Sequence, residues 1–95
     1  MKLVGRMILE DLKREHPDVS KRLDAWCIEV EASTWTTPHE VKERYRSADF
    51  PGGNRAIFDI KGNQYRVLAK IDYRRGIVLI EKAGSHADYN GWRIK

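Results

Sequence analysis

The residues best suited to chemistry lie in the C-terminal half of the chain. They are two arginines, a lysine, a glutamate, a histidine and a tyrosine: Arg55, Arg66, Lys70, Glu81, His86 and Tyr89. A guanidinium binds phosphodiester oxygens through two parallel hydrogen bonds, whereas an ammonium adds a point charge. A histidine side chain has an ordinary pKa of about 6.5 and can transfer protons near neutral pH. If these side chains converge, they can bind a phosphodiester and move protons around it.

Three β-strands have to position these residues. Period-2 alternation of apolar and polar residues, with glycine at each break, predicts strands over 54–60, 64–73 and 77–83. Tight turns at 61–63 and 74–76 join them. Gly84 ends the last strand, and the remaining residues have the composition of a loop or tail.

The N-terminal half is predicted to be helical. Apolar stripes predict helices over 6–15 and 17–32, and a capping box at Thr37-Pro38-His39-Glu40 begins a third helix that ends near Tyr45. Residues 2–4 are a candidate edge strand, and 47–53 are a loop by composition. We therefore expect a single domain, 1–95, of the α+β class. Its N-terminal helices pack on one face of a three- to four-stranded antiparallel sheet.

The two turns determine which side chains share a face of this sheet. A two-residue turn at 62–63 places Arg55 opposite Lys70, and one at 75–76 places Lys70 opposite Glu81. One face then gathers the apolar residues and is predicted to be the core: Ala56, Phe58, Ile60, Tyr65, Val67, Ala69, Ile71, Tyr73, Val78 and Ile80. The second face gathers mainly charged residues: Arg55, Ile57, Asp59, Arg66, Leu68, Lys70, Asp72, Leu79 and Glu81.

The residue pattern leaves two interpretations of the second face open. In one, it is a solvated sheet surface with cross-strand ion pairs such as Lys70–Glu81, which antiparallel sheets commonly have. In the other, its arginines and lysine bind a phosphodiester, with His86 and Tyr89 at the rim.

Composition narrows the class of protein. The net charge of +4 suits a polyanionic partner such as nucleic acid, although many small domains carry as much. The single cysteine, Cys27, cannot form an internal disulfide, and no apolar run approaches the roughly 20 residues of a membrane span. We therefore expect a cytoplasmic protein without a membrane partner. His16, His39 and Cys27 lack the spacing of metal ligands, so no metal site or cofactor is expected.

A sequence motif covers the first hairpin and continues past the last strand. It reads Ile57-Phe58-Asp59-Ile60-Lys61-Gly62-Asn63-Gln64-Tyr65-Arg66, followed by Gly84, His86 and Tyr89. Further matching positions lie in order along nearly the whole chain: His16-Pro17-Asp18, Leu23, Trp26, Trp35, Thr37-Pro38, Glu40-Val41-Lys42, Tyr45, Ser47-Ala48-Asp49, Asn54-Arg55, Ile71 and Tyr73. On these residues the chain closely resembles the HigB family of type II toxins, which are RNA-cleaving members of the RelE-like superfamily.

The resemblance implies a compact RelE-like fold and a toxin that inhibits translation. It also implies a helix-turn-helix antitoxin partner of the HigA type, in a toxin–antitoxin hetero-oligomer. The implied activity is metal-independent endonucleolytic cleavage of mRNA, generally with the message held in the ribosomal A site. In that reaction the 2′-OH of the RNA attacks the adjacent phosphodiester.

The resemblance also implies roles for individual residues. His86 is the candidate for proton transfer, and Arg66 for holding the non-bridging phosphate oxygens. Lys70 would add a point charge, and Tyr89 would orient the phosphate or stack on a base. Arg55, Arg74, Arg75 and Lys82 are further candidates for RNA binding.

Glu81 departs from the family pattern. Similar sequences often carry an arginine at or near this position. Glu81 is a candidate general base, or else it neutralises Lys70 and weakens phosphate binding. Two alternatives to the ribosome-dependent nuclease follow: a degenerate member that binds RNA or antitoxin without cleavage, and an RNase that needs no ribosome.

Overall fold

The computed structural model describes residues 1–93 of the chain. The elements follow one another as β1 (Lys2–Val4), α1 (Arg6–Glu15), the 3-10 helix η1 (Pro17–Val19), α2 (Ser20–Ala32), α3 (Pro38–Arg44), β2 (Asp49–Gly52), β3 (Arg55–Ile60), β4 (Tyr65–Asp72), β5 (Ile77–Ser85) and α4 (His86–Asn90). The five strands form one sheet in the order β1-β5-β4-β3-β2. The predicted α+β class, with N-terminal helices on one face of a sheet, is confirmed.

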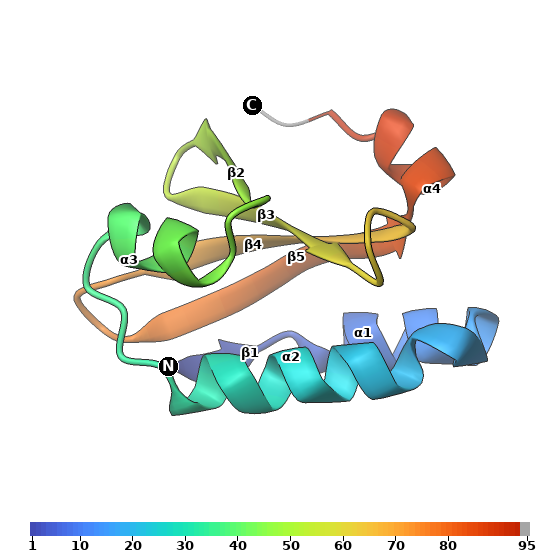
Figure 1. Cartoon of the computed structure of the whole chain (residues 1–95), viewed down its shortest axis with the longest axis horizontal. Helices are drawn as coiled ribbons and strands as arrows, with labels where there is room; N and C mark the ends of the chain where they lie inside the picture. The colour runs from blue at the N-terminus through green and yellow to red at the C-terminus, as the bar shows by residue number, and fades with distance from the viewer. Residues whose placement is uncertain (94–95) are drawn as a thin grey trace.

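The layers follow from the apolar stripes of the two long helices. Helices α1 and α2 cover one face of the sheet, whereas α4 rises from the opposite side (Figure 1). Each helix buries its apolar stripe: Leu9 and Leu12 in α1, and Leu23, Trp26, Cys27 and Val30 in α2. Arg6–Glu31 and Lys13–Asp24 ion pairs join the two helices along their exposed sides. No helix in residues 1–93 has the length and apolar character that a bilayer crossing requires.

The sheet is larger than predicted and mixed in direction. The segment expected to be a loop, 47–53, contains the edge strand β2, which pairs antiparallel with β3 through an irregular register. The sequence did not predict this strand because it contains Pro51. Proline lacks an N–H donor and is therefore tolerated in a sheet mainly at an edge. At the other edge, β1 runs parallel to β5, with Lys2 opposite Ile77. The expected antiparallel sheet of three to four strands is therefore a mixed sheet of five.

The two hairpins differ in how well the sequence predicted their register. Between β3 and β4 the prediction is confirmed, because Arg55 lies opposite Lys70. Between β4 and β5 it is wrong, because Lys70 lies opposite Leu79 and not opposite Glu81. The Asp72 carboxylate accepts a hydrogen bond of 3.0 Å from the backbone N–H of Arg75. This bond stabilises a turn longer than the expected two residues and moves the pairing by two positions.

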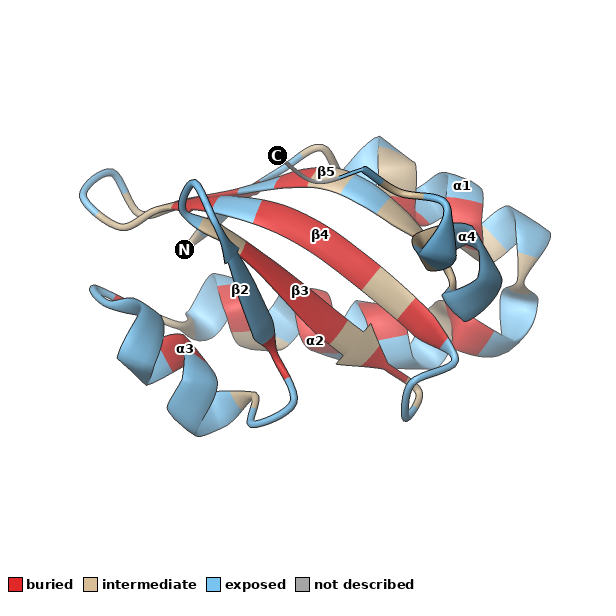
Figure 2. Ribbon diagram, turned by 90° about the horizontal axis from the view of Figure 1, so that it is seen from above, coloured by how far each residue is buried: buried red, intermediate tan, exposed pale blue. Residues whose placement is uncertain are grey.

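The predicted core face is confirmed. All its residues are buried except Tyr73, which is half-buried and packs against the same cluster. Phe58 lies at its centre, with ring centroids 5.2 Å from Trp26, 5.3 Å from Tyr45 and 6.4 Å from Trp35. Trp35, which is buried, therefore belongs to the core. Figure 2 shows the same division, with buried residues in β3 and β4 and exposed ones along β2 and α4.

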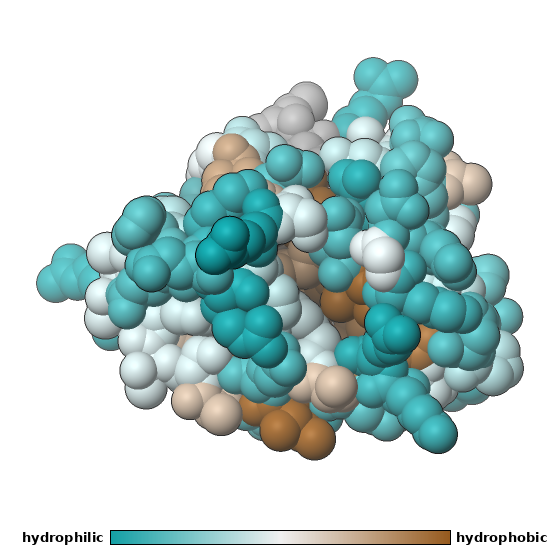
Figure 3. Space-filling model, viewed as in Figure 1, coloured by the Kyte–Doolittle hydropathy of each residue, from teal (hydrophilic) through white to brown (hydrophobic). Residues whose placement is uncertain are grey.

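A hollow remains between α2 and the end of β3. It has a volume of about 230 Å³ and includes Trp26 and Ile60 among its lining residues. Figure 3 shows apolar surface at the bottom of a depression on this side of the molecule, between hydrophilic rims.

Asp18 fastens η1 to the β3–β4 hairpin. Its carboxylate accepts a hydrogen bond of 2.8 Å from Lys61 Nζ and one of 2.9 Å from the Tyr65 hydroxyl. The Lys61 ammonium, and then the Tyr65 hydroxyl, hold the pKa of Asp18 below its ordinary value. A carboxyl with a lowered pKa in the folded state stabilises the fold above its ordinary pKa, and this stabilisation is lost as the pH falls through the folded-state pKa.

We predict that Asp18→Asn lowers the free energy of unfolding at neutral pH, and that this effect shrinks as the pH falls through the lowered pKa of Asp18 and the wild-type carboxyl becomes protonated. Urea unfolding of both proteins at a series of pH values from about pH 7 into strong acid measures the difference. The control is Asp11→Asn, which removes a carboxylate paired with Arg14 on the exposed side of α1. A constant difference across the pH range would contradict the prediction.

Candidate active site

The second face of the sheet is not a simple solvated surface. Ile57 and Leu68 lie opposite each other at its centre, and each is only 3% exposed although neither belongs to the main core. Their neighbours along the two strands are Asp59 and Arg66 on one side and Arg55 and Lys70 on the other. The aliphatic parts of such long charged side chains can cover apolar surface while their charged ends reach outward. This face therefore presents charged groups on a buried apolar base.

Arg66 is the most enclosed charged side chain of this face. Only 15% of its side chain is exposed, and its guanidinium carbon lies 4.3 Å from the ring centroid of Tyr89. Nε lies 3.2 Å from Asp59 Oδ1, and Nη1 lies 3.8 Å from Asp49 Oδ2. Despite its closeness to Asp59, the buried Nε has no hydrogen-bond partner with good geometry among residues 1–93. The guanidinium is thus held by charge and by an aromatic face, with donor capacity left over.

The segment predicted to be a loop forms the helix α4, which carries His86 and Tyr89. A capping box begins it: Ser85 Oγ accepts from the Asp88 N–H at 3.2 Å, and Asp88 Oδ2 accepts from the Ser85 N–H at 3.0 Å. The backbone N–H of His86 donates to the Gln64 carbonyl at 2.9 Å, which ties the helix to the β3–β4 turn. The pattern Ser-x-x-Asp was the signal that sequence reasoning missed.

Gly84 lets α4 approach the sheet. Gly84 is buried opposite Arg66, and a Cβ atom there would lie 2.8 Å from the Cβ of Asp88. Because real Cβ atoms do not come so close to a neighbour, only glycine permits this packing. The helix therefore lies directly over the end of β4 and β5 that holds Arg66.

Three aromatic rings follow one another along this helix and just beyond it. The centroids of His86 and Tyr89 are 6.1 Å apart, and those of Tyr89 and Trp92 are 5.4 Å apart in an edge-to-face arrangement. His86 is exposed, whereas Tyr89 and Trp92 are partly buried. The structure thus brings Tyr89 into contact with Arg66, places His86 next to Tyr89, and adds Trp92 on the other side of that ring.

Glu81 occupies a β-bulge in β5. Ile80 pairs with Ala69 and Lys82 with Leu68, so Glu81 is the extra residue between two consecutive pairs. Its carboxylate accepts a hydrogen bond of 2.7 Å from Arg55 Nε, and both side chains are about three-quarters covered. The expected Lys70–Glu81 pair is therefore replaced by an Arg55–Glu81 pair.

Of the remaining predicted residues, Lys70, Arg74 and Arg75 lie away from Arg66. Lys70 is four residues further along β4, which corresponds to about 13 Å of strand. Arg74 and Arg75 are in the β4–β5 turn, where Arg75 Nε lies 3.7 Å from an oxygen of Asp72. Lys82 is exposed on β5 opposite Leu68, two positions along the charged face from Arg66. Lys70, Arg74 and Lys82 have no ion pair within residues 1–93, so each leaves a positive charge unneutralised.

The described part of the chain does not bring together three metal-ligating side chains of the His, Cys, Asp or Glu type. An enclosed guanidinium under a tyrosine ring can bind an anion and stack on a planar group. The histidine next to that ring on the same short helix can exchange protons.

Comparison with known proteins gives two matches. A family model described as a RelE-like toxic component of a toxin–antitoxin system, the HigB toxin, matches residues 19–92. The chain is also 23% identical over 92 residues to the mRNA interferase HigB of Escherichia coli O6:H1, which covers 95% of this chain and 89% of that protein. The matched region includes Arg66, Glu81, His86 and Tyr89.

We predict that Gly84→Ala lowers the free energy of unfolding by about 1–3 kcal/mol, because the added methyl group pushes α4 away from β5. Amide hydrogen exchange should quicken over 86–90, and the Tyr89 ring should leave Arg66. The matched control is Gly91→Ala, where the added Cβ lies 3.5 Å from the Asp88 carbonyl oxygen, an ordinary contact. Equal effects of the two substitutions on α4 would contradict the role assigned to Gly84.

Proposed function

We propose that this chain, which belongs to the HigB family of RelE-like toxins, is an endoribonuclease that cleaves mRNA and thereby inhibits translation. The name of the E. coli relative, an mRNA interferase, supports the substrate and the reaction. The observation that carries the proposal is the enclosed guanidinium of Arg66, packed under Tyr89 on the helix that also bears His86.

The proposed reaction uses the RNA's own 2′-OH as nucleophile. The attack gathers negative charge on the non-bridging oxygens of the phosphate, and a fixed guanidinium is suited to stabilise it. Arg66 is fixed before substrate arrives, because Asp59 and the Tyr89 ring hold it on two sides. Such preorganisation favours the transition state over the more loosely bound ground state.

His86 is the proposed proton-transfer group. It is exposed and lies next to Tyr89, the ring that covers Arg66, which supports a role toward a phosphodiester bound there. In the proposed mechanism it takes the 2′-OH proton or supplies one to the 5′-oxygen leaving group. Tyr89 orients the phosphate or stacks on a neighbouring base.

We assign Glu81 a positioning role. Its carboxylate is already bonded to Arg55 at 2.7 Å, and its partner across the strands is not Lys70. This arrangement supports a function in holding Arg55 toward the RNA rather than in abstracting a proton. Lys70 then keeps its charge for the RNA backbone together with Lys82.

The family also suggests the partners of this chain and its location in the cell. We propose that cleavage depends on the ribosome, needs no metal ion, and takes place in the cytoplasm. A HigA-type antitoxin with a helix-turn-helix would neutralise the toxin in a hetero-oligomer. The net charge of +4 and the unneutralised cations Lys70, Arg74 and Lys82 support contact with RNA, and Arg75 in the same turn as Arg74 is a further candidate contact.

A second candidate function is binding of RNA or antitoxin without cleavage. Two carboxylates, Asp59 and Asp49, lie near the guanidinium of Arg66 and reduce its net attraction for a phosphate. The nuclease requires an incoming phosphate to displace the more distant one, Asp49, at 3.8 Å. If the phosphate cannot do so, the site binds weakly and does not react.

We predict that the wild-type chain cuts messages within their reading frames in a translating extract, and that His86→Ala and Arg66→Ala each reduce cutting by about 10²-fold or more. Mapping of 5′ ends measures the cuts. His39→Ala is the matched control, because His39 is an exposed histidine that lies beside Glu43 on α3. The same RNA without ribosomes tests the ribosome-independent RNase.

Three outcomes would contradict parts of this proposal. If the wild type cuts naked RNA as fast as it cuts messages in the translating extract, cleavage does not depend on the ribosome. If cuts persist in His86→Ala, His86 does not take part in the reaction. No cuts at all, with folded protein, would favour the binding function.

We predict that Glu81→Gln and Arg55→Ala have similar, modest effects on cleavage, and that the double variant is no worse than either alone. This non-additivity is expected if Glu81 acts through Arg55. The pH profile of cleavage should keep its shape in Glu81→Gln. A lost acid limb in that profile would show that Glu81 is the general base.

A further inference from the structure

A cavity of about 500 Å³ opens on the second face, at the end far from α4. Its walls are partly apolar: Ile77 and Leu79 of β5 line it, and Leu79 is 38% exposed. Volumes of this order accommodate small ligands, and mostly apolar pockets with a few convergent polar groups are the usual binding sites. Neither the catalytic proposal nor the family match assigns this cavity a function.

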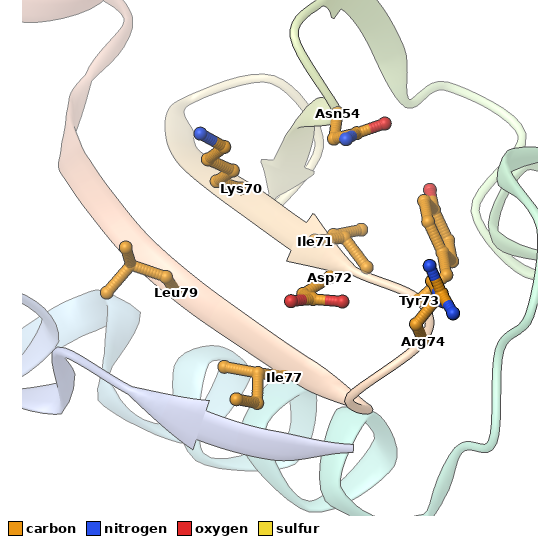
Figure 4. A pocket seen from close by; sticks show the side chains of 8 residues that line it. All are labelled: Asn54, Lys70, Ile71, Asp72, Tyr73, Arg74, Ile77 and Leu79. Carbon is orange, nitrogen blue, oxygen red and sulfur yellow. The ribbon is translucent and has the colours of Figure 1, made fainter.

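Two cations lie on opposite sides of the cavity. Figure 4 shows Lys70 at one side and Arg74 at the other, with the Asp72 carboxylate between them. Neither Lys70 nor Arg74 has an ion pair within residues 1–93. Two unneutralised cations beside an apolar wall suit a ligand that combines an anionic group with a flat apolar one.

Asp72 and Asn54 supply polar groups that can form hydrogen bonds with a ligand in this cavity. One oxygen of Asp72 accepts from the Arg75 N–H, which fixes the carboxylate and leaves it further lone pairs. Asn54 has φ of 60°, and its carbonyl accepts from the Ile71 N–H at 2.7 Å, which holds it at the rim of the cavity. A fixed carboxylate accepts hydrogen bonds from amino groups such as those on cytosine, adenine and guanine.

We propose that this cavity binds one nucleotide of single-stranded RNA whose base carries an exocyclic amino group. Lys70 and Arg74 hold the adjacent phosphates, the apolar wall contacts the base, and Asp72 and Asn54 bond its edge. Uracil lacks the amino group and is disfavoured. The inference rests on the proposed nuclease function and adds to it a subsite that selects sequence.

The distance to Arg66 is consistent with one continuous RNA path. Lys70 lies about 13 Å along β4 from Arg66. Stacked nucleotides of one strand are about 3.4 Å apart and extended ones further, so the cavity is a few nucleotides from the phosphate at Arg66. The base selected at the cavity is therefore not the one at the cut itself.

The first test is binding, which does not require activity. Purified chain is titrated with AMP, CMP, GMP and UMP while the amide signals of 70–79 are followed by NMR. AMP, CMP and GMP should shift these signals saturably, with UMP roughly tenfold weaker. Asp72→Asn should bring UMP level with the others, because an amide can donate as well as accept.

Two further variants separate the anionic contact from the base contact. Lys70→Ala with Arg74→Ala should weaken all four nucleotides alike. Lys21→Ala, which removes an exposed lysine of α2, should change nothing. No saturable binding, or equal binding of UMP and CMP in wild type, would overturn the inference.

The second test is the distribution of cuts in a translating extract. With Asp72→Asn, cuts should extend to sites with uridine at the selected position, a few nucleotides from the cut. An unchanged distribution of cuts overturns the proposed subsite.

The failure of the subsite can be told apart from the failure of the nuclease proposal. If the wild type cuts nothing but still binds CMP more tightly than UMP, the nuclease proposal is wrong and the nucleotide site stands. If Asp72→Asn weakens antitoxin binding and leaves nucleotide binding unaltered, the cavity is a protein contact and the inference is overturned.

Discussion

The single extra residue in β5, Glu81, decides which later side chains of this strand join the charged face of the sheet. Strict alternation after the buried Ile80 would turn Lys82 and Gly84 toward the helices. With the bulge, Lys82 lies opposite Leu68 and Gly84 opposite Arg66, so both join the charged face, while Ala83 packs on the core. Because the position opposite Arg66 is then a glycine, α4 can approach closely and carry Tyr89 onto the guanidinium. The placement of His86 depends on this one irregularity.

The sequence allowed some of these features to be predicted and hid others for physical reasons. Alternation and the Gly62-Asn63 turn were enough for the first hairpin, and the Asp59–Arg66 neighbourhood follows from that register. The second hairpin contains a turn that the Asp72 side chain stabilises, and its second strand contains a bulge. Neither feature leaves a mark in the alternation of apolar and polar residues, so the sequence does not reveal them. β2 was not predicted because Pro51 and the two glycines at 52 and 53 give the segment 47–53 the composition of a loop. α4 was missed because it has only five residues, whose stability comes from a cap and from packing against the sheet.

The charges of this face divide into two groups that differ in exposure and in ion pairing. Arg66 and Arg55 are paired with Asp59 and Glu81 and are mostly covered. Lys70 and Lys82, which are exposed, have no such pair within the described residues. Paired, covered groups keep a fixed geometry, which a reaction requires, whereas long exposed cations adapt to a flexible polyanion. One face of a small sheet thus carries both covered, paired charges and exposed, unpaired ones.

The edges of the sheet affect the solubility of the chain. An unpaired strand edge can recruit another chain and begin aggregation. Here the outer strands are short: β1 has three residues and begins with a lysine, and β2 has four and contains a proline. The long strand β4 is interior to the sheet, and β1 pairs with the first three residues of β5. The proline that made β2 hard to foresee thus also limits further strand pairing at that edge.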